Sequence, residues 1–154
     1  MSFVNTSVAA GCLILALSLE AAAPGVRVQA AGGTDPAITA KSTFRLDLTG
    51  TESLLLHFER RDIGIAYRKI NTVEYGQNVS RRYAAAVLIS PVLLLSKSRQ
   101  HFVTIGYLDE TDKQQALVFR VEKGDIRTVL TSLEARTGRR VEYQDGEARK
   151  SGKG

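Results

Sequence analysis

The sequence is poor in the residues that build disulfides and metal sites. Among its 154 residues it has one cysteine and two histidines. A single cysteine, Cys12, excludes a disulfide framework and any cysteine-rich zinc or iron–sulfur site. Two histidines leave little for metal chemistry. The sequence therefore implies no cofactor and no metal site.

Catalytic motifs are missing as well. The sequence contains no nucleophile elbow, no glycine-rich phosphate loop and no HExxH zinc motif. His57 and Glu59 would share one strand face and could begin an acid/base or metal pair, but a solvated or hydrogen-bonded histidine is the commoner outcome. The same holds for His101. We therefore expect a protein that is not an enzyme.

What the sequence does contain is typical of one globular domain. Apolar residues make up 44% of the chain and charged residues 24%, which argues against wholesale disorder, collagen and coiled coil. A length of 154 residues suits a single domain. The formal charge of +5 mildly favours acidic partners or anionic surfaces.

The N-terminal apolar run, residues 8–19, is too short for a helix across a bilayer core of about 30 Å. It suits a signal peptide over residues 1–30, with cleavage after Ala30 because Val28 and Ala30 place small side chains before that bond. We then expect export to the periplasm or beyond. No Lys or Arg precedes the run, so an uncleaved anchor is the alternative. Residues 31–42 are expected to be a linker.

From residue 43 onward, apolar residues alternate with polar ones, which predicts half-buried strands. Short polar turns separate the first four strands, as in an antiparallel meander. Asn71 is expected to interrupt the chain before the fourth strand. The apolar positions are Phe44, Leu46, Leu48; Leu54, Leu56, Phe58; Ile63, Ile65, Tyr67; Val73, Tyr75; Val103, Ile105, Tyr107; Leu117, Phe119, Val121; and, for a short last strand, Val141 and Tyr143.

The spacing changes near the C-terminus and predicts a helix over residues 125–137. Asp125 is expected to cap it through its side-chain oxygen, and Gly138 to end it in a left-handed conformation. We expect residues 145–154 to form a disordered charged tail. Residues with helical spacing form one apolar stripe: Ile126, Val129, Leu130 and Leu133.

This order of elements resembles the pleckstrin-homology superfold and its GRAM-like relatives. The likeness covers residues 43–144. It implies a mainly β domain with one C-terminal α-helix, a PH-like antiparallel β-sandwich or partly open barrel. No ligand residues carry over, because residues 50–53 hold no base where the lipid-binding motif would lie. The stretches that carry the likeness are Ile70-Asn71-Thr72-Val73-Glu74-Tyr75-Gly76, His101-Phe102-Val103-Thr104-Ile105 and Leu133-Glu134-Ala135-Arg136-Thr137-Gly138, the last two being similar to small exported bacterial proteins.

The strongest functional lead is an uncharged apolar run, residues 83–95, flanked by bases. The run could pack in the core, dock on an anionic membrane with its flanking bases on the head groups, or form a surface for a protein partner or a second copy of the chain. The expected contact residues are Arg81, Arg82, Tyr83, Val87, Leu88, Ile89, Val92, Leu93, Leu94, Leu95, Lys97 and Arg99.

Four basic pairs invite comparison with nucleic-acid binding. Tyrosines near three of them could add stacking. The export signal argues against such a partner, however. We therefore expect an exported, non-enzymatic binding module for a protein or lipid, with membrane association as the alternative function. The pairs are Arg60-Arg61, Arg68-Lys69, Arg81-Arg82 and Arg139-Arg140, and the tyrosines are Tyr67, Tyr75 and Tyr83.

Overall fold

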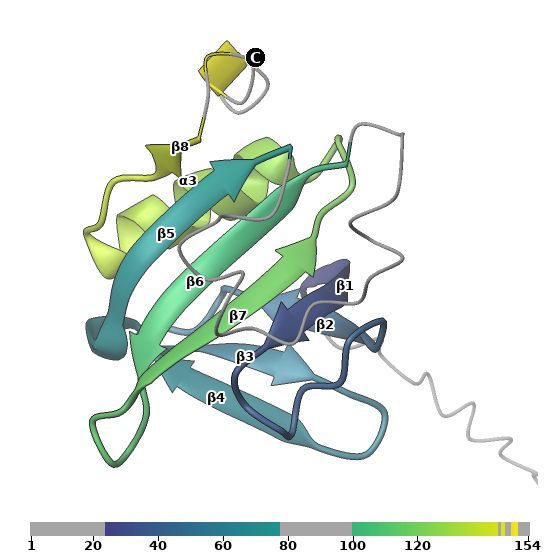
Figure 1. Cartoon of the computed structure of the whole chain (residues 1–154), viewed down its shortest axis with the longest axis vertical. Coiled ribbons are helices and arrows are strands. Elements are labelled where there is room, and N and C mark those ends of the chain that lie inside the picture. Colours follow the sequence, from purple (N-terminus) through teal and green to yellow (C-terminus); the bar gives the residue numbers. More distant parts are fainter. Residues whose placement is uncertain (1–23, 78–99, 145, 147–148, 151–154) are drawn as a thin grey trace, which may run out of the picture.

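The computed structural model describes residues 24–77, 100–144, 146, 149 and 150 (Figure 1). Within this part of the chain the fold is mainly β. Eight strands form one sheet that does not close, and one α-helix follows seven of them. The elements are β1 (Val26–Gly33), β2 (Thr43–Asp47), β3 (Ser53–His57), β4 (Asp62–Ala66), the 3-10 helix η1 (Tyr67–Lys69), β5 (Ile70–Gly76), β6 (Phe102–Leu108), β7 (Gln114–Arg120), α3 (Ile126–Thr137) and β8 (Glu142–Tyr143).

The strand order is β4-β3-β2-β1-β7-β6-β5-β8. Every pairing is antiparallel except that of β5 with β8, which makes the sheet mixed. Strand β1 joins two meanders, because it pairs with β2 on one side and with β7 on the other. In Figure 1 the β5–β7 half lies across the β2–β4 half, and α3 lies near β5 and β8.

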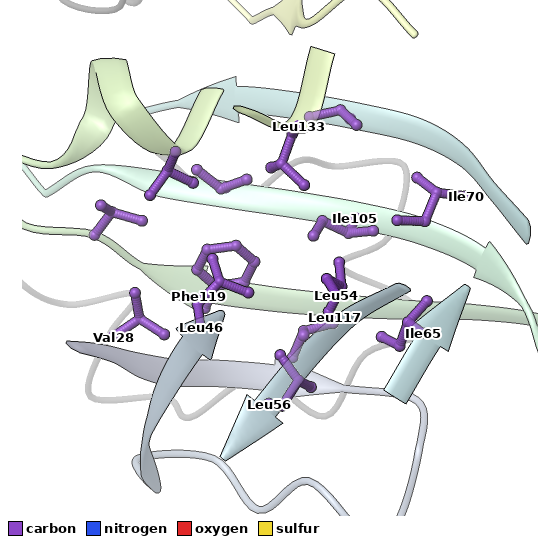
Figure 2. Packing of buried hydrophobic residues seen from close by; sticks show 14 of the residues in the cluster. Val28, Leu46, Leu54, Leu56, Ile65, Ile70, Ile105, Leu117, Phe119 and Leu133 are labelled. Carbon is purple, nitrogen blue, oxygen red and sulfur yellow. The ribbon is translucent and has the colours of Figure 1, made fainter. Parts of the chain in front are cut away.

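The core fills the space between the two halves of the sheet. Figure 2 shows Leu46, Leu54 and Leu56 from one half facing Ile105 and Phe119 from the other. The alternation predicted for these strands is confirmed, since all five side chains are buried. Burying each contributes about 1.5–3 kcal/mol.

Strand β1 lies where the sequence predicted no strand. Its residues pair with Thr43–Leu46 of β2 and with Leu117–Arg120 of β7. The expected cleavage point after Ala30 falls inside β1, and the expected linker over residues 31–42 begins inside it. Ala30 and Ala31 are fully buried. Cleavage after Ala30 would therefore divide a central strand of this sheet, whereas export itself stays a prediction.

Helix α3 matches the predicted helix in position. Its stripe of Ile126, Val129, Leu130 and Leu133 is buried, and Gly138 ends it with a φ of 67°. The predicted cap is wrong: Asp125 makes no side-chain capping hydrogen bond and is itself close to helical. Its backbone carbonyl accepts the first helical hydrogen bond, from Val129 N–H at 2.9 Å, so the helix begins at this residue without a side-chain cap.

Two smaller differences concern the ends of β5 and of the chain. Asn71 does not interrupt the fourth predicted strand: it lies within β5, where the register shifts between Ile70 and Thr72. The predicted last strand is confirmed as β8. In the expected disordered tail, Gly146, Arg149 and Lys150 have helical backbone, and the other residues of 145–154 lie outside the described part.

Candidate functional site

The contact residues predicted for the apolar run all lie outside the described residues. This includes residues 83–95, the flanking pair Arg81 and Arg82, and the bases Lys97 and Arg99. The three hypotheses for this run therefore stay predictions. Among the residues that the structure describes, no helix is long and apolar enough to cross a membrane.

A groove of about 800 Å³ lies between α3 and the chain that follows it. We call it the arginine groove. One wall is the exposed side of α3, and the other is the segment from Gly138 to β8. Its lining residues are Arg127, Leu130, Thr131, Glu134, Gly138, Arg139, Arg140, Val141, Tyr143 and Arg149.

Hydrogen bonds from backbone N–H groups fix both walls of the arginine groove. Gly138 N–H donates to Glu134 O at 2.9 Å, which turns the chain back along the helix. Val141 N–H donates to Glu134 Oε1 at 2.9 Å, and Arg139 N–H donates to Thr137 Oγ1 at 3.1 Å. The second wall is thus tied to the helix, and its continuation, β8, is tied to β5.

The groove is strongly basic. Four arginines line it, Arg127, Arg139, Arg140 and Arg149, and all four are exposed. Glu134 is the one described acidic residue in this lining. Its carboxylate is already engaged with Val141 N–H. Guanidinium groups bind phosphate and carboxylate oxygens with paired N–H donors. The arrangement can therefore hold an anionic ligand.

Tyr143 also lines the groove. Burial and the nearby Glu134 raise the pKa of its hydroxyl, and Arg149 partly opposes them. The hydroxyl therefore stays protonated at neutral pH. The sequence offered one signal for this site, the Arg139-Arg140 pair directly after Gly138. It did not show that α3 would lie opposite.

The structure places His57 against two aspartates rather than in a pair with Glu59. His57 Nδ1 lies 2.9 Å from Asp62 Oδ1, and Nε2 lies 3.6 Å from Asp47 Oδ2. Burial raises the pKa of Asp47, but hydrogen bonds from Thr49 and the nearby imidazole of His57 lower it more, so the pKa falls below its ordinary value. The described residues form no cluster suited to a metal ion.

His101 is engaged with a core tyrosine. Its Nδ1 lies 2.6 Å from the Tyr75 hydroxyl, and the two rings stack with an interplanar angle of 7°. Burial lowers the pKa of His101. This favours the neutral imidazole and a structural role.

The basic pairs do not combine with tyrosines into a stacking surface in the described residues. Tyr67 and Tyr75 are 3% and 0% exposed, so neither can stack on a base. Arg60-Arg61 lies in the β3–β4 turn, Arg68-Lys69 in η1, and Arg139-Arg140 in the arginine groove.

Comparison with known proteins does not indicate a function for this site. A scan of the sequence against models of protein families finds no match, and a search of curated proteins finds no significant one.

Proposed function

We propose that this chain is a non-enzymatic binding module that holds an anionic ligand in the arginine groove. The observation that carries the proposal is the convergence of four arginines on a groove whose walls are fixed by hydrogen bonds. The engagement of both histidines, one with aspartates and one with Tyr75, supports a binding role rather than acid/base catalysis.

The proposed fold is PH-like. Seven strands in the order β4-β3-β2-β1-β7-β6-β5, followed by one C-terminal helix, support it. With β1 in place, the loop between the first two strands is residues 34–42, and Lys41 is its only base. This argues for a ligand site elsewhere than that loop. The proposed export depends on residues 8–19, which lie outside the described part.

The test compares two double variants that remove equal charge. Arg139→Gln with Arg140→Gln removes both positive charges from one wall of the groove. Arg60→Gln with Arg61→Gln, in the β3–β4 turn, is the control. The probes are inorganic phosphate and phosphatidylcholine vesicles with and without phosphatidylserine. Each base near an anionic surface contributes about 1 kcal/mol, so we expect the groove variant to lose about thirtyfold in vesicle binding.

The outcomes separate the sources of the anion. Binding of free phosphate that the groove variant loses indicates a soluble anionic ligand, and binding of anionic vesicles alone indicates a lipid surface. Equal losses of binding in both double variants would mean that net charge alone causes the effect. That result would contradict binding in the arginine groove. No binding of either probe by the wild type would contradict the proposal.

The alternative function is docking on a membrane through residues 83–95. It is favoured by the absence of charge in that run and by the bases on both sides. Replacing Arg81, Arg82, Lys97 and Arg99 with Gln should then lower vesicle binding by up to about a thousandfold, with the effect shrinking in high salt. If the groove variant keeps vesicle binding while this quadruple variant loses it, the alternative holds.

A further inference from the structure

A second hollow, of about 500 Å³, lies where the end of β4 approaches the β6–β7 hairpin (Figure 1). Strand β4 lines it from one half of the sheet, and the hairpin lines it from the other. Its volume falls within the range of about 300–1,000 Å³ that is typical of small-molecule sites. It shares no lining residue with the arginine groove, so it is a separate candidate site.

Apolar side chains contribute to the lining of this hollow. Ile63 and Ile65 belong to β4, Pro36 to the loop after β1, and Leu108 to the end of β6. Ile65 is 3% exposed and is part of the core cluster, so the hollow adjoins the core. An aliphatic group bound here would be withdrawn from water, which favours binding.

A nearly buried tyrosine lines the same hollow. Tyr107 is 6% exposed, and its hydroxyl forms no hydrogen bond within the described part of the chain. Burial and the nearby carboxylates of Asp35 and Asp109 raise the pKa of this hydroxyl to about 12. Both aspartates line the hollow, so the hydroxyl lies near carboxylates of the lining and is available to a ligand.

The lining carries charges of both signs, and they come from different elements. Asp35 belongs to the loop after β1, and Asp109 and Glu110 belong to the β6–β7 hairpin. Arg68 and Lys69 belong to η1. The charge of a ligand therefore depends on which of these groups are still free.

Lys69 and Asp109 are already engaged within the chain. Lys69 Nζ lies 2.6 Å from Asp112 Oδ1. Asp109 Oδ1 accepts from Thr111 N–H at 2.8 Å, and its Oδ2 accepts from Gln115 Nε2 at 2.8 Å. These two charges are neutralised or held by neighbouring residues.

The other three charged residues of the lining keep groups that a ligand can use. Arg68 and Glu110 are exposed, and neither forms an ion pair or hydrogen bond within the described residues. Asp35 Oδ1 accepts from Ala37 N–H at 2.8 Å, which orients the carboxylate. Its Oδ2 has no partner in the described part of the chain.

These free groups select a ligand with two charges. A simple anion at Arg68 would be repelled by Asp35 and Glu110, and a simple cation beside those acids would be repelled by Arg68. We propose that the hollow binds a small zwitterion with an aliphatic side chain, the chemistry of a free apolar α-amino acid. Its ammonium group binds at Asp35 and the Tyr107 hydroxyl, its carboxylate binds Arg68, and its side chain packs against the apolar lining.

The probe is L-leucine, and isothermal titration calorimetry on the full chain measures its binding. Two analogues of the same shape each lack one charge: isopentylamine has no carboxylate, and isocaproate has no ammonium group. We expect each analogue to bind about tenfold more weakly than leucine, because one charge-assisted contact is lost.

Two variants assign each charge of the ligand to its partner. Arg68→Gln should weaken leucine binding about tenfold without weakening that of isopentylamine. Asp35→Asn should weaken leucine binding by a similar factor without weakening that of isocaproate. Arg60→Gln and Glu59→Gln are controls of equal charge, because both residues are exposed in the β3–β4 turn and lie outside the lining.

Three results would overturn the proposal: no binding of leucine by the wild type at millimolar concentration, equal binding of leucine and either analogue, or equal losses in the control variants. Loss of leucine binding only in the Arg139→Gln, Arg140→Gln variant would assign the ligand to the arginine groove instead. Where a variant does not fold, as its thermal transition shows, the comparison of leucine with its analogues on the wild-type chain decides.

Discussion

At the scale of the residue, the buried carboxylate of Asp47 shows how a polar group is accommodated in this fold. Asp47 is 5% exposed at the end of β2. Its Oδ1 accepts from Thr49 N–H at 2.8 Å and from Thr49 Oγ1 at 2.7 Å, and its Oδ2 faces His57. Asp62, on the other side of His57, is largely exposed. The two aspartates therefore share one histidine in very different surroundings.

Asp47→Asn is expected to lower the free energy of unfolding by about 1–3 kcal/mol at neutral pH, because Thr49 then donates to a neutral amide oxygen instead of an ionised carboxylate. The folded-state pKa of Asp47 lies below its ordinary 3.8, so its stabilisation is present above that pH. It disappears as pH falls through the folded-state pKa. Urea unfolding of both proteins at about pH 7 and about pH 3 measures the difference.

Asp62→Asn is the matched control for this prediction. Its exposed pair with His57 is expected to contribute only about 0–1 kcal/mol. A gap between wild type and Asp47→Asn that does not narrow in acid would show that the charge of Asp47 is not what stabilises the fold.

At the scale of the element, α3 serves two purposes with its two faces. Its buried stripe covers the core at β5 and η1, and its exposed side forms one wall of the arginine groove. Gly138 connects α3 to the second wall of the groove. Its left-handed backbone lets the chain reverse, which brings Arg139 and Arg140 alongside the helix they follow.

Leu133→Ala is expected to lower the free energy of unfolding by about 2–5 kcal/mol, because Leu133 is fully buried and its loss leaves a cavity. Thr128→Ala, on the exposed side of α3, should change it by less than about 0.5 kcal/mol. Chemical denaturation measures both. A loss below about 1 kcal/mol for Leu133→Ala would mean that α3 does not complete the core.

At the scale of the whole molecule, β1 holds the two meanders together. It pairs with both, and it supplies Val28 and Ala30 to the core. Its second half is closely packed: a Cβ on Gly33 would lie 3.3 Å from Ala116 O. The continuity of the sheet therefore depends on a strand whose second half consists of small residues.

Removal of residues 1–30 is expected to abolish cooperative unfolding, because it deletes most of β1 and separates β2 from β7. Removal of residues 1–23 leaves β1 whole and should preserve a sharp thermal transition. Circular dichroism during heating distinguishes the two. Equal transition temperatures for both truncated chains would show that β1 is dispensable, and cleavage after Ala30 would then be compatible with the fold.

Local spacing in the sequence predicts the elements whose side chains alternate or repeat. The strands with Leu46, Leu54 and Ile105 and the helix ending at Gly138 follow from local spacing, because burial on one face leaves a period in the chain. Strand β1 shows no such period of apolar side chains, since Ala30 and Gly33 have low strand propensity and both faces of the strand are buried there. The arginine groove, in contrast, depends on tertiary packing. Packing brings Arg127 of α3 and Arg139 to one groove, and no spacing along a chain encodes which elements become neighbours.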